Sequence, residues 1–509
     1  MFADLGLGPL SEPLTGRHWD RLAVHARCAR RLTFYARRGV ARGDRVFLHY
    51  GNTPEFFVDL IALWRLGACA VPIDTRLTPF EIDTLAGAAA PRFSLWFGAP
   101  DADLAQRLGA RGAAIVDASE ADAVAADDAP VGGERVGLDQ DALILFTSGT
   151  TGQPKGVVHT HRSLRARWTA LRHAFGVCAH RRTLCLLPTT FGHGLICNCL
   201  FPWLAGQHLF IVPPFKADLI VQLGALLDEH EITFLSSVPT IWRLALKTAA
   251  PPRAPRLERV LCGSAPLSAH LWNDIREWTN ARDVWNAYGI TETGSWLAGT
   301  SVGEFTPEDG LIGAPWGGVI KITRTADATV HLDGADECTV GESGQVWVNT
   351  PALMRGYLGR DDLTNDVVAA GWFRTGDIGL IDARGWLYLR GRERDEINKG
   401  GMKVYPADID AVVERFELTV DVCTFAVEDA LLGEDVGLAV VLRQADQPTL
   451  QRLHDWMTQH LGRHQLPRRW YVVDEIPRSA RGKVNRAAVA ARCTALSPVH
   501  LSSVRGEPV

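Results

Sequence analysis

Short apolar runs alternate with helix-length segments over roughly the first 300 residues of the chain. Several of these runs are rich in Val, Ile, Leu or Phe and are bounded by polar or turn-forming residues: 44–50, 142–146, 182–188, 208–213 and 259–263. Runs of this length predict strands, and the longer segments between them have room for helices. The pattern therefore predicts an α/β fold class in which helices are layered on sheets.

The character of the sequence changes after about residue 310. Gly-rich turns there surround short apolar runs at 345–348 and 386–390, which predicts a small β-rich unit. The last hundred residues return to mixed strand and helix patterns. Two stretches have little pattern, and we expect 117–135 to be a surface connection and 494–509 to be a frayed tail.

Residues 19–38 carry the spacing of an amphipathic helix. Apolar residues recur at steps of three and four, and basic residues gather on the opposite side. The predicted buried face is Leu22, Ala26, Ala29, Leu32 and Ala36, and the predicted basic face is Arg27, Arg30, Arg31, Arg37 and Arg38. The favoured interpretation is a solvated face of extended Arg side chains, and the alternative is a basic contact surface for a partner.

Length and composition describe an ordinary folded chain. Its 509 residues predict about three structural units. Apolar residues make up 47% and charged residues 22%, which argues against disordered, collagen-like and coiled-coil classes. The formal net charge of −5 predicts no general affinity for nucleic acid or acidic membranes.

The sequence lacks the patterns of a secreted or membrane-spanning protein. Its first residues have neither the basic segment nor the uninterrupted apolar core of a signal peptide. No apolar run approaches the length of about 18 residues that a membrane span needs. The ten Cys are scattered without a regular frame, which fits reduced thiols. We therefore expect a cytoplasmic protein.

The strongest local signal is the stretch ALILFTSGTTGQPKGVVHTH. A strand is predicted to end at Phe146, and hydroxyl residues, glycines and Lys155 follow it. Such a loop can point backbone N–H groups, hydroxyls and one ammonium at a polyanion, which predicts a phosphate-binding site. A Walker A loop is the alternative, but its Lys is followed by Ser or Thr, and here Gly156 follows.

This loop resembles the phosphate loop of the adenylate-forming superfamily, which includes acyl-CoA and aryl-CoA ligases, amino-acid adenylation domains and firefly-type luciferases. Further segments resemble the family's motifs in the family's order: NAYGITET (286–293), GWFRTGD (371–377), GRERDEINKGGMKVYP (391–406) and PRSARGKVNR (477–486). Weaker matches extend the resemblance over nearly the whole chain. The sequence is therefore identified as a member of this superfamily.

Lysine is rare in this chain, because seven of its 53 basic residues are Lys and 46 are Arg. Lys155 and Lys483 stand in the two loops where the family places a compact cation. Adenylation requires a carboxylate oxygen to attack the α-phosphorus of ATP, so positive charge must gather there. The resemblance implies that Lys483 bridges the substrate carboxylate to the α-phosphate and that Thr291 hydrogen-bonds the same phosphate. We expect Lys483, Thr291 and Arg394 to be the catalytic residues.

The resemblance also implies how the nucleotide is held. Tyr288 would offer its ring to adenine, Asp377 would accept the ribose hydroxyls, and Glu292 with Thr150 would hold Mg²⁺. Asn286 stands where many relatives carry Gln, and both side chains offer an amide. The implied nucleotide contacts are Thr147, Ser148, Gly149, Thr150, Thr151, Gly152, Lys155, Gly263, Ser264, Ala265, Asn286, Ala287, Tyr288, Gly289, Thr291, Glu292, Asp377, Arg392 and Lys483.

We expect a large N-terminal domain and a small mobile C-terminal domain from the same resemblance. The first would span 1–393, with two α/β sheet layers and a small β-barrel-like subdomain. The second, an α+β domain, would span 394–495, and 496–509 would form a tail. Members of the family rotate the C-terminal domain about one hinge residue between two half-reactions. That residue is Arg394 here, where relatives usually carry Asp or Lys.

The acyl pocket is predicted from the segment PTTFGHGLICN, residues 188–198. Phe191 aligns with the aromatic residue that gates the thiol tunnel in many relatives, and His193 would line the acyl site. Ser264 and Trp296 are further candidates for the pocket wall. The segment contains no Asp to pair with an α-ammonium, which disfavours an amino acid. A Trp here would shorten the cavity and favour aryl or short to medium acyl acids.

Three functions fit the sequence. The first is an ATP-dependent acid:CoA ligase that uses ATP, Mg²⁺ and CoA. The second is an acyl-AMP or aryl-AMP ligase that loads the phosphopantetheine of a separate acyl carrier protein. The third is an inactive nucleotide-binding scaffold, against which the presence of Lys483, Glu292 and Asp377 argues. A luciferase-like oxygenase has no support in the sequence.

Overall fold

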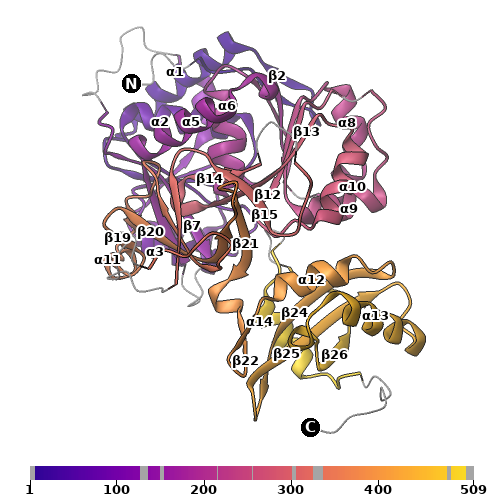
Figure 1. Cartoon of the computed structure of the whole chain (residues 1–509). Helices are drawn as coiled ribbons and strands as arrows, with labels where there is room; N and C mark the ends of the chain where they lie inside the picture. Colours follow the sequence, from indigo (N-terminus) through magenta and orange to yellow (C-terminus); the bar gives the residue numbers. More distant parts are fainter. Residues whose placement is uncertain are drawn as a thin grey trace.

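The computed structural model describes residues 6–125, 136–148, 154–214, 216–254, 256–300, 305–324, 336–478 and 483–499. The chain forms a large N-terminal body and a smaller C-terminal unit that lies against one end of it (Figure 1). Three sheets organise the described residues, two in the N-terminal body and one in the C-terminal unit. In the same residues, no helix combines the length and apolar character that crossing a membrane requires. The predicted α/β class is confirmed.

The first sheet carries the strand that precedes the phosphate loop. Its strands lie in the order β18-β8-β7-β4-β3-β5-β6. Helices connect its parallel strands, as expected for consecutive βαβ units. The strands are β3 (Arg45–Leu48), β4 (Cys69–Pro72), β5 (Phe93–Trp96), β6 (Ala114–Asp117), β7 (Asp141–Ser148), β8 (Pro154–Thr160) and β18 (Gly356–Tyr357), and the helices are α2 (Pro54–Leu66), α3 (Pro79–Ala89) and α4 (Ala102–Ala110).

The second sheet begins as a parallel α/β layer. Its parallel strands are β9 (Arg182–Cys185), β10 (His208–Ile211), β11 (Phe234–Ser237), β12 (Arg259–Gly263) and β13 (Asp283–Ile290). The strands β1 (Leu10–Glu12) and β2 (Arg17–Trp19) complete its far edge. Helices α7 (Ala217–Val221), α8 (Leu223–Glu229), α9 (Pro239–Thr248) and α10 (Ala269–Thr279) connect the strands. Every strand predicted from the apolar runs before residue 310 is present.

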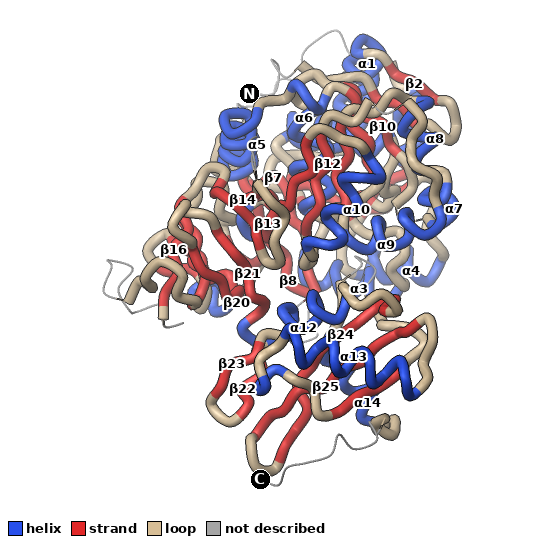
Figure 2. Tube along the Cα trace, turned by 45° about the vertical axis from the view of Figure 1, so that its right-hand side comes forward, coloured by secondary structure: helices blue, strands red, loops and turns tan. Residues whose placement is uncertain are grey.

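The Gly-rich unit predicted after residue 310 continues this second sheet as antiparallel strands (Figure 2). It contains β14 (Ser295–Gly299), β15 (Leu311–Pro315), β16 (Val319–Thr323), β17 (Gly344–Asn349), β19 (Val368–Ala369), β20 (Trp372–Ile381) and β21 (Leu387–Arg392), with the short helix α11 (Asp361–Asn365) nearby. The strand order β13-β14-β15-β21-β20 joins the two halves. The ends of β13, β20 and β21 are thereby carried by one continuous sheet.

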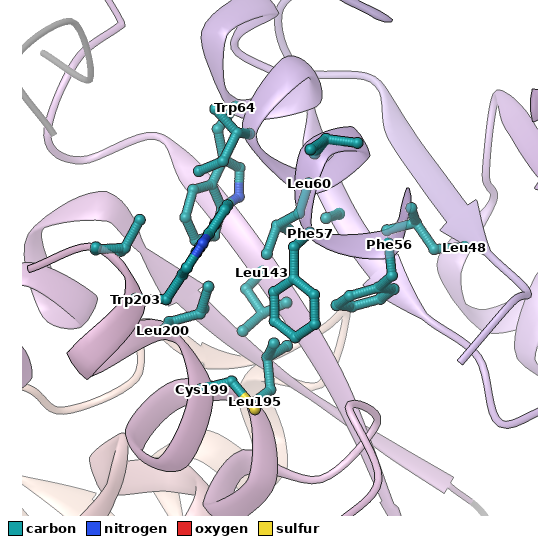
Figure 3. Close-up of a cluster of buried hydrophobic side chains, with 14 of the residues drawn as sticks. Leu48, Phe56, Phe57, Leu60, Trp64, Leu143, Leu195, Cys199, Leu200 and Trp203 are labelled. Atoms are coloured by element: carbon teal, nitrogen blue, oxygen red, sulfur yellow. The ribbon is translucent and has the colours of Figure 1, made fainter. Parts of the chain in front are cut away.

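A shared apolar core fixes the first sheet against the second. Helix α2 begins at the Thr53 N-cap, ends at Gly67 in the left-handed conformation, and is buried along almost its whole length. Figure 3 shows its aromatic side chains facing the π-helix η3 (His193–Leu200) and the short helix α6 (Phe201–Trp203). The Trp64 indole donates to the Ala142 carbonyl of β7 at 2.7 Å. This core sets the strand before the phosphate loop against the segment that carries His193.

Helix α1 (Arg21–Arg37) confirms the predicted helix, but the predicted buried face is wrong. Leu22 is 81% exposed, whereas the buried residues include Val24, Cys28, Arg31 and Tyr35. Arg31 makes two contacts with the buried Asp59 carboxylate of α2, at 2.9 and 3.0 Å.

Arg31 is the buried exception on the predicted basic face, since Arg37 and Arg38 are exposed and Arg27 and Arg30 are half-buried. Arg27 pairs with Asp122 and Arg38 with Glu120, both from the 3₁₀ turn η1 (Ala118–Ala123). That turn falls within the predicted surface connection 117–135, of which residues 126–135 lie outside the described residues. Part of the predicted basic face is therefore taken up by ion pairs at the surface, and only Arg31 is buried.

The C-terminal unit is a five-stranded sheet with helices packed on it. Its strands are β22 (Ile397–Lys399), β23 (Met402–Val404), β24 (Thr419–Asp429), β25 (Gly433–Leu442) and β26 (Arg469–Val472), and its helices are α12 (Pro406–Glu414), α13 (Gln447–His460) and α14 (Arg486–Thr494). The 3₁₀ turn η5 (Glu393–Asp395) joins it to β21 of the N-terminal body. The boundary at 394 stays a prediction, and residues 500–509 of the predicted tail lie outside the described residues.

Candidate active site

The phosphate loop is fixed at both ends by strand pairing. Thr147 at the end of β7 lies opposite Lys155 of β8, and the Thr147 hydroxyl donates to the Lys155 carbonyl at 3.5 Å. The Lys155 ammonium lies 5.2 Å from the ring centroid of Tyr357, within cation–π range. The backbone of 149–153 and the side chain of Ser148 lie outside the described residues. The predicted contacts of Ser148, Gly149, Thr150, Thr151 and Gly152 therefore stay predictions.

A buried cluster connects β13 to the ends of β20 and β21. The Tyr288 hydroxyl donates to one carboxylate oxygen of Asp377, and the Arg392 guanidinium contacts the other at 2.8 Å. Arg392 also donates to the Thr375 carbonyl at 3.0 Å. Burial, and then the neighbouring Asp377 charge, raise the pKa of Tyr288 well above its usual value, so the phenol stays protonated. Three of the predicted nucleotide contacts are thus held in one hydrogen-bonded group.

The 3₁₀ turn η4 (Thr291–Thr293) presents Thr291 and Glu292 directly after this cluster. The Tyr357 hydroxyl donates to Glu292 Oε1 at 2.8 Å. The Thr291 hydroxyl oxygen would lie 3.6 Å from a Cβ built on Gly192, the residue before His193. The turn therefore stands between the predicted phosphate contacts and the predicted acyl pocket.

Two buried basic side chains hold this turn through its backbone, and sequence reasoning missed both. His159 Nε2 lies 2.7 Å from the Thr291 carbonyl, and Arg167 donates to the Thr293 carbonyl at 2.8 Å and to the Trp316 carbonyl at 2.7 Å. Burial lowers the pKa of His159 to about 4 and that of Arg167 to about 10. His159 is therefore neutral at pH 7 and Arg167 is charged.

Glycines allow the site's strands to approach closely. A Cβ on Gly263 would lie 2.4 Å from the Ala287 carbonyl oxygen, and one on Gly289 would lie 2.1 Å from the Ser295 carbonyl oxygen. Ala265 lies just beyond β12 and is half-buried. The Asn286 amide donates to the Leu311 carbonyl at 2.7 Å inside the sheet. The structure thus gives Asn286 a contact between strands, and its predicted contact with adenine stays a prediction.

The four predicted acyl-pocket residues lie together and are joined by a fifth, Ser236. His193 Nδ1 lies 2.7 Å from the Ser264 hydroxyl, and His193 Nε2 lies 2.6 Å from the Ser236 hydroxyl. The ring centroids of Phe191 and Trp296 lie 5.7 and 5.6 Å from that of His193. Ser236 belongs to an ordinary apolar strand in sequence, and no signal there marks it as part of a site.

Lys483 of the C-terminal unit acts electrostatically on this pocket. Burial, followed by the Lys483 charge, lowers the pKa of His193 to about 3. Since Lys483 is an exposed residue of the C-terminal unit and His193 is buried in the N-terminal body, the two units are arranged with this lysine toward the pocket. Arg394 lies in the exposed turn η5, where its guanidinium is 3.7 Å from Asp395. The structure does not bring Arg394 to the other predicted catalytic residues.

The donor set suits a nucleotide with its metal. Mg²⁺ bound to a nucleotide takes one or two carboxylates and completes its shell with phosphate oxygens and water. Glu292 supplies one such carboxylate. In the described part of the chain, no group of three or more His, Cys, Asp or Glu residues could hold a metal by itself. A metal at this turn would therefore depend on phosphate oxygens, as it does in nucleotide sites.

The chain matches known proteins over nearly its whole length. Residues 20–358 match the AMP-binding enzyme family, and residues 408–483 match the AMP-binding enzyme C-terminal domain. It is 30% identical to long-chain-fatty-acid–CoA ligase FadD13 of Mycobacterium tuberculosis, over 94% of this chain and 93% of the relative. It is 28% identical to oxalate–CoA ligase of Arabidopsis thaliana, over 89% of each chain.

Solved structures agree with the fold. ATP-bound MatB from Rhodopseudomonas palustris superposes with a TM-score of 0.83 at 25% identity, covering 96% of both chains. The anthranilate CoA ligase AuaEII with anthranoyl-AMP superposes with a TM-score of 0.85 at 20% identity, covering 96% of this chain and 95% of the other, and supports the fold alone. With its motifs in order and both family domains matched, the chain belongs to the AMP-binding enzymes of the adenylate-forming superfamily.

Proposed function

We propose that this protein is an ATP-dependent acid:CoA ligase. In the first half-reaction a carboxylate oxygen of the acid attacks the α-phosphorus of ATP, the bond to the bridging oxygen breaks, and pyrophosphate leaves with the electron pair. In the second, the thiol sulfur of CoA attacks the acyl carbonyl, the thiol proton is released, and AMP leaves. The products are a thioester, AMP and pyrophosphate.

One observation carries this proposal: the charge of Lys483 in the C-terminal unit acts on the buried His193 of the N-terminal body, so this ammonium lies within electrostatic range of the predicted acyl pocket. Thr291 stands beside the same pocket. An ammonium and a hydroxyl at this point would stabilise the charge that develops on the α-phosphate during attack. The pocket behind them would hold the acyl part of the acid.

The remaining predicted contacts act around this centre. Lys155 would bind the outer phosphates, Asp377 and Arg392 the ribose, and the Tyr288 ring the adenine. Glu292 with Thr150 would hold Mg²⁺, which supplies charge neutralisation for the leaving pyrophosphate when bound. Phe191 and Trp296 would bound the acyl pocket, which favours an aryl or a short to medium acyl acid.

We propose CoA rather than a carrier protein as the acceptor, because both sequence relatives compared above are named CoA ligases. A cytoplasmic location remains part of the proposal. All ten cysteines are free thiols in the structure, which is compatible with a reducing compartment.

The decisive experiment incubates the protein with ATP, Mg²⁺ and a panel of carboxylic acids, with and without CoA, and measures pyrophosphate and thioester. We expect acid-dependent pyrophosphate release and CoA-dependent thioester. Release of pyrophosphate without any CoA thioester would instead favour a carrier-protein acceptor. No acid-dependent release with any member of the panel would contradict the proposed activity.

Replacing Lys483 by Ala tests the assignment of the catalytic lysine. Loss of such a contact is expected to slow adenylate formation by about 10²- to 10³-fold. Lys403→Ala is the matched control, since Lys403 is an exposed lysine of the same unit that pairs with Glu396. Pyrophosphate release by Lys483→Ala at the rate of the unsubstituted protein would refute the role, provided that circular dichroism shows both variants folded.

A further inference from the structure

A chain of three polar side chains crosses the floor of the acyl pocket. Ser236 of β11, His193 at the start of η3 and Ser264 after β12 are joined by hydrogen bonds of 2.6 and 2.7 Å. Ser236 and His193 are 0% and 3% exposed. Ser264 has a φ of +67°, a conformation that costs a non-Gly residue energy and persists where the surroundings impose it. Polar side chains buried this deeply among apolar residues indicate a role beyond packing.

Counting hydrogens shows that the chain has one donor to spare. His193 is neutral, because burial and the Lys483 charge hold its pKa far below 7, so one ring nitrogen donates and the other accepts. One serine hydroxyl therefore donates to the ring, and the other accepts from it. The serine that accepts keeps its own O–H for another partner. Either tautomer leaves exactly one serine O–H directed elsewhere.

The indole N–H of Trp296 is a second hydrogen-bond donor that is available beside the same imidazole. Its ring is 2% exposed, and its Nε1 is buried with no hydrogen-bond partner among the described residues. The ring lies edge-on to His193 at 5.6 Å and packs near Phe234 at 6.0 Å. A buried N–H without an acceptor costs free energy, and a hydrogen bond from it to an acceptor on the bound molecule would remove this cost.

The charge balance of the pocket decides which acceptor fits. Lys483 is the one charged group acting on His193 in the described part of the chain, and the reaction assigns it to the reacting carboxylate. A second carboxylate on the acid would enter a buried pocket with a neutral imidazole and no cation of its own, which is unfavourable. A neutral oxygen on the acid would accept hydrogen bonds from the serine O–H and the Trp296 N–H without this cost.

We propose that the acyl pocket selects small carboxylic acids that carry an uncharged hydrogen-bonding oxygen, a hydroxyl or keto group, on the acyl part, and that Ser236 is a specificity-determining residue. This inference rests on the acid ligase activity proposed above. It narrows the substrate class from any aryl or short acyl acid to one with a hydrogen-bonding substituent.

The test compares matched acids on the full-length protein. Benzoate is paired with its three monohydroxy derivatives, butanoate with 3-hydroxybutanoate and 3-oxobutanoate, and benzene-1,4-dicarboxylate serves as the doubly charged acid. We expect at least one oxygenated acid to exceed its unsubstituted partner by about tenfold or more in kcat/KM, since a site with buried donors rejects an analogue that leaves them unpaired. The dicarboxylate is expected to be the poorest of the aromatic acids.

Two substitutions on one strand separate specificity from folding. Ser236→Ala should reduce the preference, measured as the ratio of kcat/KM for the oxygenated acid to kcat/KM for the unsubstituted acid, by about tenfold. Ser237→Ala is the matched control, because Ser237 points away and bonds the Leu261 carbonyl and the Trp242 indole. It should lower stability and leave the preference unchanged. Trp296→Phe, which removes the N–H donor together with part of the buried ring, should reduce the preference as Ser236→Ala does.

Binding measurements keep this inference separate from the proposed activity. Calorimetry of each acid with the protein and AMP reports the preference without turnover. Preferential binding of the oxygenated acids without any adenylation would support the pocket assignment and overturn the ligase function. Equal binding and equal turnover of oxygenated and unsubstituted acids would overturn the pocket assignment, as would a Ser237→Ala variant that lost the preference as fully as Ser236→Ala.

Discussion

At the scale of single residues, the turn η4 is held in place by side chains that are not themselves predicted to contact a ligand. Arg167 is fully buried and has no carboxylate partner among the described residues; it donates to the backbone carbonyls of Thr293 and Trp316. Burying a guanidinium this way is costly, which is why its pKa falls to about 10. In return for this cost, the hydrogen bonds of the guanidinium fix the turn that carries Thr291 and Glu292 to helix α5 (His161–Phe175).

Arg167→Met is therefore expected to impair the first half-reaction without removing any group that contacts ATP. Carbonyls left unpaired in the interior cost about 1–3 kcal/mol each, and a turn that relaxes by a fraction of an ångström misplaces Thr291. We expect kcat for adenylate formation to fall about tenfold or more and the thermal midpoint to fall. Arg165→Met, an exposed position of the same helix, is the control. An unstable variant with unchanged kcat would assign Arg167 to stability alone.

Single residues also show where sequence reasoning stops. Lys155, Glu292 and Asp377 were predicted because their types stand in motifs whose chemistry needs them. Ser236 and Arg167 carry no such mark. Alternation along β11 places Ser236 and Ser237 on opposite faces, but the strand does not say which face meets His193. That information comes from the packing of η3 on β11, which joins residues far apart in the sequence.

At the scale of elements, strands were predicted well and the face of one helix was not. A run such as ERVLCG becomes β12 because a parallel strand buried on both faces needs only continuous apolar character. The face of α1 was misjudged because the pattern treats every Arg as solvent-facing. Arg31 instead bonds Asp59, whose carboxylate also accepts from the hydroxyls of Tyr35 and Tyr50. A buried ion pair between two helices is invisible to a pattern read along one of them.

The turn η5 is the element that the hinge hypothesis tests. Arg394 lies in a 3₁₀ turn, whose φ near −60° is the value that proline imposes. Arg394→Pro should therefore tolerate the present arrangement and resist rotation out of it. We expect adenylate formation within about threefold of the unsubstituted protein and thioester formation slowed by about tenfold or more.

Single-turnover kinetics of each half-reaction measure this prediction directly. Arg394→Ala, which removes the side chain and leaves φ free, is the control and should retain both half-reactions. If Arg394→Pro slows both steps to the same extent, the residue does not act as a hinge. If Arg394→Ala alone slows thioester formation, the side chain matters rather than the backbone.

At the scale of the whole molecule, buried neutral histidines link stability to pH. Burial lowers the pKa of seven histidines: to about 3 for His49, His193 and His208, to about 4 for His159 and His161, and below the usual value for His25 and His180. In the unfolded chain each would titrate near its usual value of about 6.5. Below that pH the histidines of the unfolded chain bind protons, whereas those of the folded protein stay neutral. Their contribution to the free energy of unfolding is therefore fully present above pH 6.5 and is lost as pH falls toward 4.

Each such histidine is expected to cost about 1.4 kcal/mol per pH unit below 6.5. The prediction is measured as the thermal midpoint at pH 7.5, 6.5 and 5.5. His49 stacks on Trp96 with ring centroids 3.8 Å apart, so His49→Phe keeps a stacked ring and removes a titrating group. That variant should show a shallower fall in stability with acid, and His173→Gln, at an exposed position, should not. Identical pH profiles for all three proteins would contradict the assignment.

The orientation of the two units rests on few contacts. Arg243 of α9 donates to Glu414 at the end of α12 at 2.6 and 3.0 Å, and Arg390 of β21 lies 3.5 Å from Asp408 of α12. Both pairs join the N-terminal body to the C-terminal unit in the arrangement that turns Lys483 toward the acyl pocket. Rotation about η5 would have to break them. On the hinge hypothesis, they would favour the arrangement for the first half-reaction over the one for the second.

Glu414→Gln tests whether the Arg243–Glu414 ion pair favours this orientation of the two units. A half-buried ion pair of this kind contributes about 0.5–1 kcal/mol, which changes the ratio of two orientations by roughly two- to fivefold. We expect adenylate formation to slow by that factor at limiting ATP, while thioester formation from preformed adenylate is unchanged or faster. Glu417→Gln, which removes an exposed pair with Arg452 inside the C-terminal unit, should change neither step. Equal slowing of both steps by Glu414→Gln would mean that the pair stabilises the fold and does not govern the rotation.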